Sequence, residues 1–187
     1  MLQKLKRSEW KVLNDCLRVS HAGEMGANYI YSGQMKKIDI ALKPLIKHMK
    51  DQEMGHLNKF NELVPMTNTR PSMLLPIWKA SGYILGYGTA MFGKEMAMLC
   101  TEAVETAIGQ HYNDQLRELI KLEQLVDDEV KPFIKELQLT ISKFRDEELE
   151  HKDIAEKNDA LKAPFYQVAS KLIQGGCWTA IEIAKRI

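Results

Sequence analysis

The chain has few residues that break helices. Its 187 residues include only six prolines and eleven glycines. Because proline interrupts both helices and sheets, the long proline-free runs favour helices over many short strands. Apolar residues recur at spacings of three and four, and no segment shows the strict alternation of a half-buried strand. We therefore predict an all-α fold, in a single domain spanning residues 1–187.

The chain also has few cysteines and almost no net charge. The three cysteines, Cys16, Cys100 and Cys177, form no C-x-x-C pair, which argues against a zinc ribbon or a thioredoxin motif and favours a reduced compartment. With 26 Lys and Arg against 25 Asp and Glu, the net charge is +1, so the sequence has no electrostatic footprint for nucleic acid. The N-terminal residues carry charges throughout and lack the apolar stretch of a signal peptide, so localisation cannot be read from a tag.

We expect two helical halves and a last helix. The first half spans about residues 9–63 and breaks near Pro44, because proline is well placed in the first turn of a new helix. The second half spans about residues 94–160 and breaks around residues 123–128. The last helix covers about residues 164–187.

Residues 71–93, PSMLLPIWKASGYILGYGTAMFG, form an unusually apolar segment between the two halves. Its single charge is Lys79, and its length is close to that of a membrane span. Pro76, the lysine and four glycines argue against a transmembrane helix, whereas Trp78 and the tyrosines suit a segment that lies in the membrane interface. A buried connector inside the helix bundle is the alternative.

A repeated motif is the most informative feature. DQEMGH (residues 51–56) and DEELEH (residues 146–151) both read D-x-E-x-x-H, which places each Glu and His three residues apart on one helical face. In both helices this pair continues an apolar stripe and should therefore point into the core. A buried carboxylate is costly unless something compensates for its desolvation, and a metal ion does so.

Two further glutamates interrupt apolar stripes, Glu24 in the first helix and Glu105 in the third. The order Glu, E-x-x-H, Glu, E-x-x-H is the ligand pattern of a di-iron carboxylate site in a ferritin-like four-helix bundle. Carboxylates and imidazoles suit iron or manganese better than metals that prefer thiolates. The six candidate metal ligands are Glu24, Glu53, His56, Glu105, Glu148 and His151.

Nearby polar residues offer alternatives to this set. Glu102 lies almost one turn before Glu105 and would point inward if the helical phase differed, although we favour Glu105. We expect exposed positions for Asp51, Asp146 and His48. His21 and His111 are either groups that support the ligands or structural histidines.

Four stretches carry a family resemblance: HAGEMGANYIYSGQM, DQEMGHLNKFNEL, residues 70–117 and KFRDEELEHKDIA. Together they resemble the demethoxyubiquinone hydroxylase family, the monooxygenases of ubiquinone biosynthesis, over about residues 10–187. The family's ligands match the same six residues. The resemblance implies two Fe ions per chain, hydroxylation of the ring of a polyprenylated demethoxyubiquinone by O2, and NADH as electron donor.

The resemblance also implies partners and a location. The polyprenyl quinone lies in the bilayer, so the enzyme should be a peripheral protein of the mitochondrial inner membrane on the matrix side, or of the cytoplasmic face of a bacterial plasma membrane. A lipid-binding partner protein is implied in eukaryotes, and a homo-oligomer is an open alternative. No nucleic-acid partner is expected.

Two further residues match the family, with departures around them. Tyr112 matches a tyrosine near the iron site, where it takes part in electron transfer or lines the pocket, and Arg186 matches an arginine implicated in nicotinamide binding. Glu182 and Asp15 stand where the family has an aromatic residue and an arginine. The 43 residues from Glu105 to Glu148, against 29 from Glu24 to Glu53, predict a longer loop or extra turns near residues 119–132.

Two other classes of protein remain open. A ferritin-like protein that handles iron or peroxide would use the same ligands without needing a lipid-facing segment. A helical membrane adaptor without enzymatic activity would pair its buried acids with Lys or Arg.

Overall fold

The computed structural model describes residues 2–187, and these form six α-helices, three single 3₁₀ turns and no strand. The all-α prediction is therefore confirmed. The helices are α1 (Arg7–Lys37), α2 (Lys43–Met66), α3 (Leu75–Met91), α4 (Lys94–Leu125), α5 (Lys131–Lys157) and α6 (Tyr166–Ala184).

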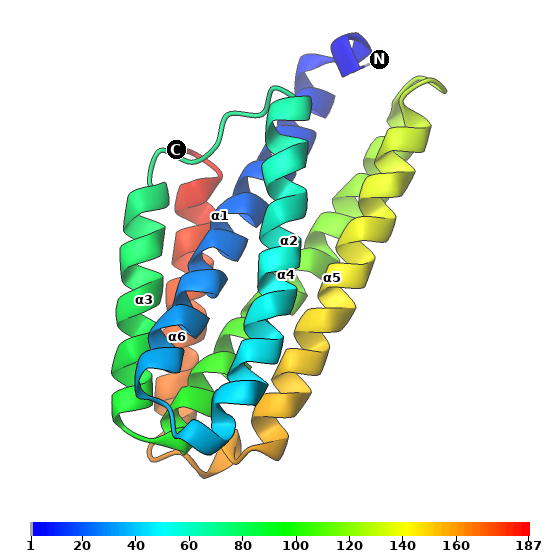
Figure 1. The fold of residues 1–187 in the computed structure, drawn as a ribbon. Helices are drawn as coiled ribbons and strands as arrows, with labels where there is room; N and C mark the ends of the chain where they lie inside the picture. The colour runs from blue at the N-terminus through cyan, green and yellow to red at the C-terminus, as the bar shows by residue number, and fades with distance from the viewer. Residues whose placement is uncertain (1) are drawn as a thin grey trace.

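The six helices form three layers of two helices each (Figure 1). Helices α1 and α4 form the middle layer. On one side they pack against α2 and α5, which completes a four-helix bundle, and on the other side they pack against α3 and α6. The bundle was expected, and so was a helix at the C-terminal end, but the sequence did not predict that α3 and α6 would cover the same side.

Proline and glycine mark the helix ends. Pro44, Pro76 and Pro132 each lie in the first turn of a helix, where a missing amide hydrogen costs nothing. Gly93 connects α3 to α4 with a φ of 104°, a backbone conformation that favours glycine and allows a very short connection.

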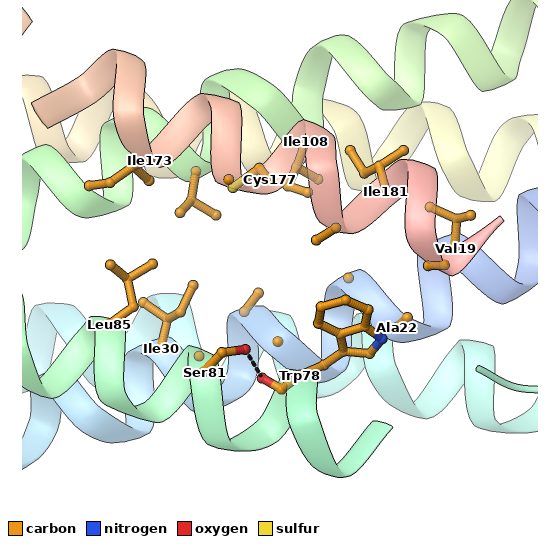
Figure 2. A pocket seen from close by; sticks show the side chains of 18 of the residues that line it. Val19, Ala22, Ile30, Trp78, Ser81, Leu85, Ile108, Ile173, Cys177 and Ile181 are labelled. Carbon is orange, nitrogen blue, oxygen red and sulfur yellow. Dashed lines mark hydrogen bonds between the residues drawn. The ribbon is translucent and has the colours of Figure 1, made fainter. Parts of the chain in front are cut away.

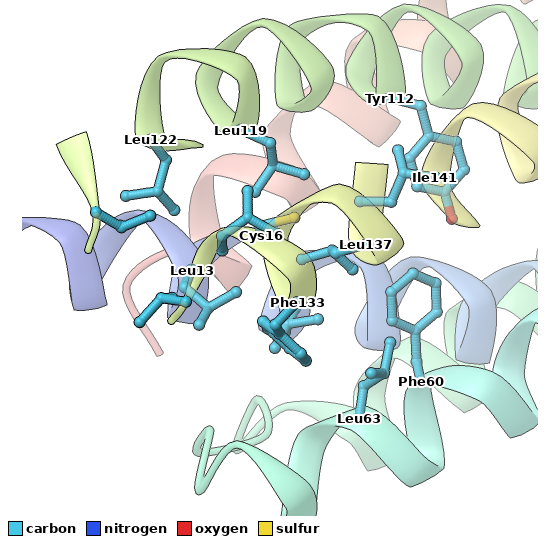
Figure 3. Packing of buried hydrophobic residues seen from close by; sticks show 14 of the residues in the cluster. Leu13, Cys16, Phe60, Leu63, Tyr112, Leu119, Leu122, Phe133, Leu137 and Ile141 are labelled. Carbon is cyan, nitrogen blue, oxygen red and sulfur yellow. The ribbon is translucent and has the colours of Figure 1, made fainter. Parts of the chain in front are cut away.

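The extra residues of the second half are helical. Helix α4 continues to Leu125 and α5 begins at Lys131, so the two helices extend beyond the centre of the bundle as a hairpin (Figure 1). The first turns of α1 cover this extension. Leu13 packs there against a cluster that includes Leu122 and Phe133 (Figure 3). The additional residues between Glu105 and Glu148 thus form extra helical turns rather than a long loop.

Helices α1 and α3 are in direct backbone contact. A Cβ atom on Gly86 would lie 1.9 Å from the carbonyl oxygen of Ile30, and one on Gly82 would lie 2.5 Å from that of Gly26. A Cβ atom on Gly33 of α1 would lie 2.4 Å from the carbonyl oxygen of Tyr83. Small residues spaced by four allow this close approach.

The apolar segment 71–93 lies outside the four-helix bundle. Ile77 and Ile84 on α3 are 54% and 68% exposed, so the segment is not a buried connector. Trp78 differs from our expectation of an outward aromatic group. Its side chain is only partly exposed, packs near Val19 and donates a hydrogen bond to Ser72 Oγ at 3.2 Å. Within residues 2–187, no helix has both the length and the apolar character that crossing a bilayer requires.

Candidate metal centre

The six predicted ligands meet in the centre of the four-helix bundle. All are at most 2% exposed. They form two overlapping groups in which the ligand atoms lie within 4.8 Å of one another: Glu24, Glu53, His56 and Glu148 in one, and Glu53, Glu105, Glu148 and His151 in the other. Because Glu53 and Glu148 belong to both groups, the arrangement fits two adjacent ions that share two carboxylates.

The helical phase that was inferred from the apolar stripes is correct. In α5, the buried residues Ile141 and Phe144 precede Glu148 and His151 on one face. In α4, Glu105 points into the cluster, whereas Glu102 faces α6. The side chain of Glu102 accepts hydrogen bonds from Thr106 at 3.1 Å and from Ser170 at 3.4 Å. As expected, Asp51, Asp146 and His48 are exposed.

Seven buried atoms of the ligand side chains have no hydrogen-bond partner among residues 2–187. Both oxygens of Glu53, one oxygen each of Glu24, Glu105 and Glu148, and Nδ1 of both histidines are unsatisfied. Four contacts between Nδ1 atoms and carboxylate oxygens measure 3.2–3.4 Å. Ligands bound at ~2.1 Å around an octahedral ion are separated by about 3 Å along an edge. The donor atoms are therefore spaced as they would be around bound ions, and the residues fit a pair of divalent cations.

The pKa values of the buried ligands also favour bound cations at this site. Burial and neighbouring carboxylates raise the pKa of Glu53 and Glu105 well above the usual value. Burial alone would lower the pKa of His56, but the carboxylates of Glu24 and Glu148 raise it to about 11. In residues 2–187 no Lys or Arg forms a salt bridge with Glu24, Glu53, Glu105 or Glu148, and the ionic contacts of these four ligand glutamates are with histidine alone. The pairing that a membrane adaptor would need is thus not found.

Two residues that sequence reasoning missed orient the histidines. Glu147 accepts a hydrogen bond from His56 Nε2 at 2.7 Å, and Gln52 accepts one from His151 Nε2 at 3.0 Å. When a cation displaces the Nδ1 proton, the proton held on Nε2 keeps the ring oriented with its Nδ1 lone pair directed into the cluster, which is how such partners prepare a metal ligand. Their positions in the sequence could have pointed to these two residues, because Gln52 and Glu147 directly precede Glu53 and Glu148 in the repeated motif.

Two tyrosines donate hydrogen bonds to the cluster. The hydroxyl of Tyr112, the residue that the resemblance places near the iron site, donates to Glu24 Oε1. The hydroxyl of Tyr31 donates to Glu105 Oε1 at 2.7 Å, a role that the sequence did not reveal. Burial and the adjacent carboxylates raise the pKa of both phenols, so both stay protonated at neutral pH.

The other candidates lie away from the cluster. His21 pairs with Asn61 through Nε2 at 3.0 Å, and His111 pairs with Gln115 at 2.8 Å. Arg186 is exposed and lines a shallow depression at the end of α6, with Trp178 and Glu182. Neither histidine contacts the metal-binding residues, and the structure does not bring Arg186 to them.

An apolar cavity of about 470 Å³ lies between the middle layer and the outer layer of helices (Figure 2). Residues of α1, α3, α4 and α6 line it, and none of them is charged. Trp78 lies on its α3 wall and Cys177 on its α6 wall. None of the six metal-binding candidates reaches its surface.

Comparison with known proteins identifies the family of this chain. The family described as "Ubiquinone biosynthesis protein COQ7" matches residues 11–184. The human NADPH-dependent 3-demethoxyubiquinone 3-hydroxylase, mitochondrial, is 48% identical over 172 residues, which cover 91% of this chain and 76% of that protein. The 5-demethoxyubiquinone hydroxylase, mitochondrial, of Saccharomyces cerevisiae is 46% identical over 192 residues, covering 99% and 82%.

A bacterial relative extends the comparison. The 3-demethoxyubiquinol 3-hydroxylase of Rhodospirillum rubrum is 42% identical over 173 residues, covering 91% of this chain and 76% of that protein. The name of the human relative specifies NADPH, whereas the resemblance had led us to expect NADH. Since the family match spans nearly the whole chain, and relatives from bacteria to humans share 42–48% identity with it, this chain belongs to the COQ7 family of ubiquinone biosynthesis proteins.

Proposed function

We propose that this protein is a demethoxyubiquinone hydroxylase. It adds one hydroxyl group to the ring of a polyprenyl demethoxyquinone, with O2 as the source of oxygen and a reduced nicotinamide nucleotide as the source of electrons. The observation that carries the proposal is the pair of overlapping ligand groups, with their unsatisfied buried atoms, inside a chain whose named relatives are hydroxylases of this quinone.

The proposed cofactor is two iron ions per chain. One is held by Glu24, Glu53, His56 and Glu148, and the other by Glu53, Glu105, Glu148 and His151. When bound, such a pair supplies the redox chemistry that activates O2, which protein side chains cannot supply alone.

The surrounding residues hold and shield this site. Glu147 and Gln52 fix the histidine rings, while Tyr31 and Tyr112 keep their protons and donate to the carboxylates. Phe144 stacks on the His56 ring with the centroids 4.0 Å apart and helps to exclude water on that side.

The apolar cavity is the proposed site for the quinone. A cavity of this volume without charged groups suits a substituted ring and the first part of a prenyl tail. Ser81 on α3 and Leu172 on α6 both line the cavity and are exposed, which supports a mouth between α3 and α6. The tail would leave there towards a bilayer.

The exposed apolar side chains of the outer layer support peripheral membrane binding. Ile77 and Ile84 on α3 and Val168 on α6 are all more than half exposed. The membrane would be the mitochondrial inner membrane on its matrix side or the cytoplasmic face of a bacterial plasma membrane, in line with the mitochondrial and bacterial relatives. We expect a lipid-binding partner protein to dock on the same side.

The nicotinamide contact is proposed at Arg186. Its guanidinium group can pair with a phosphate of the nucleotide, and Trp178 beside it offers an aromatic surface. Because Glu182 in the same depression weakens an anion site, turnover with NADH and with NADPH should be compared directly.

A test of the whole proposal uses iron-loaded protein, demethoxyubiquinone, a reduced nicotinamide nucleotide and ¹⁸O₂. We expect a product heavier by one labelled oxygen atom, detected by mass spectrometry. Rapid oxidation of iron without any quinone product would favour the second candidate function, a ferritin-like protein that handles iron or peroxide, which the same ligand groups could support.

The metal site has its own test. Wild-type protein should bind about two irons per chain. Glu148→Ala removes a carboxylate that both ligand groups share and should abolish iron binding and turnover together. Asp146→Ala, at an exposed position on the same helix, is the matched control. Full iron content and activity in Glu148→Ala would show that the site is wrong.

A further inference from the structure

The cavity and the metal-binding cluster lie on opposite sides of the α1 and α4 layer. On α1, Gly23 faces the cavity and the next residue, Glu24, faces the cluster. On α4, Val104 faces the cavity and the next residue, Glu105, faces the cluster. A quinone ring in the cavity is therefore separated from the ligands by the middle layer.

One side chain spans this layer. Ile108 lines the cavity and packs against the cluster of Val104 and Cys177 on that side (Figure 2). It also packs against the core cluster that contains Tyr112 and Phe144 on the metal side. None of the other residues that line the cavity belongs to or packs against that core cluster.

The α1 helix leaves space opposite Ile108. Gly23 has no side chain, and the nearest atom to a Cβ built on it is Ile108 Cδ1 at 4.0 Å. Between Gly23 and Ile108 only one side chain stands in the layer, next to Glu24 and one turn from both Glu105 and Tyr112. A single isoleucine side chain closes it there.

We propose that Ile108, facing Gly23, is the gate between the quinone cavity and the metal centre. This inference rests on the proposed function, because oxygen transfer requires the ring carbon and the reacting oxygen to come within about 3–3.5 Å. Rotation of the whole Ile108 side chain about χ1 and χ2 clears the space opposite Gly23, and side-chain rotation is fast compared with turnover. The width of the gate is set by the side chain of Ile108 and by the lack of a side chain at Gly23. The gate therefore selects quinones by the size of their ring.

The first test measures access without turnover. Iron is removed from loaded protein by a planar apolar chelator such as bathophenanthroline, and the rate of colour formation is recorded. We expect Ile108→Ala to speed removal at least tenfold. Val104→Ala is the matched control, because it removes bulk from the same helix and cavity but has no contact with the core cluster on the metal side. Equal rates in the two variants would overturn the proposal.

The second test closes the gate. Gly23→Val should keep the iron and should bind a short-tailed demethoxyquinone within twofold of wild type, as measured by quenching of tryptophan fluorescence, because Trp78 lines the cavity. Its kcat should fall at least tenfold while KM changes little. The double variant Gly23→Val with Ile108→Ala should recover turnover, because the space is restored. Failure of this rescue would refute the pairing of the two residues.

The two tests separate this proposal from the proposed function. If no variant, wild type included, hydroxylates the quinone, the function is wrong, but the chelator rates still decide whether Ile108 controls access. If Gly23→Val loses iron during purification, the comparison of Ile108→Ala with Val104→Ala decides alone.

Discussion

Replacing Gly86 with alanine should force α3 away from α1. The added Cβ would lie 1.9 Å from the carbonyl oxygen of Ile30 and 2.6 Å from its carbonyl carbon. Because both atoms belong to the backbone of a long helix, no side chain can move aside to make room. The helices must separate by about 1 Å, which also loosens the contacts of Gly82 and Gly33.

The expected cost follows from this geometry. Overpacking typically costs about 1–3 kcal/mol. Gly88→Ala on the same helix is a matched control, because a Cβ atom there would meet nothing within 4 Å. In that variant, alanine should stabilise the helix by about 0.5–1 kcal/mol. The two variants should therefore differ by ~1.5–4 kcal/mol in the free energy of unfolding.

Thermal unfolding of the iron-loaded protein, followed by far-ultraviolet circular dichroism, measures this difference. In a chain of this size, 1 kcal/mol shifts Tm by ~2–4 °C, so Gly86→Ala should melt roughly 3–16 °C below Gly88→Ala. Iron content should remain near that of wild type, because α3 carries none of the candidate ligands. Equal melting temperatures for the two variants would refute the direct backbone contact between α1 and α3.

Three further predictions concern the metal site, the outer layer and the response to acid. Glu147→Gln should lower iron affinity ~10–100-fold in a chelator competition, because it weakens the acceptor that holds His56, whereas unchanged affinity would contradict that role. Ile77→Asp combined with Ile84→Asp should release the protein from liposomes with iron retained, while Leu139→Asp, at an exposed site on α5, should not. Burial lowers the pKa of His111 to about 4, so the unfolded chain binds its proton more readily. Stability should therefore fall as the pH drops from about 6.5 towards 4, and less so in His111→Gln when denaturant midpoints are compared.

The metal-binding candidates were predictable because they break a pattern. A glutamate or histidine at a core position of a 3.6-residue period has no ordinary explanation, so Glu105 could be preferred to Glu102 from helical phase alone. The helix break near Pro44 followed from the fixed φ of proline and its missing amide hydrogen, and the break predicted around residues 123–128 lies where α4 ends at Leu125. Both the helical period and the position of a proline can be read from a short segment of one sequence, without knowing which other segments pack against it.

The placement of α3 was not predictable in the same way. Its composition showed that it is apolar but not which face meets α1, because almost all of its residues are apolar or small. The side facing α1 is decided by glycine contacts between two backbones, and Trp78 consequently points inward rather than towards solvent. The cavity and the position of Ile108 depend on four helices at once. No periodicity within one helix reveals them.

The sharing of Glu53 and Glu148 bears on when the protein can acquire its metal. The hairpin of α1 and α2 carries three of the candidate ligands and the hairpin of α4 and α5 carries the other three, yet each group of four draws on both hairpins. Neither hairpin alone can complete either group. During synthesis, the second half must therefore be made and docked before either ion can be fully bound. If the proposed ions bind, each would cross-link the two hairpins, so metal loading would lock the two halves of the chain together after they have docked.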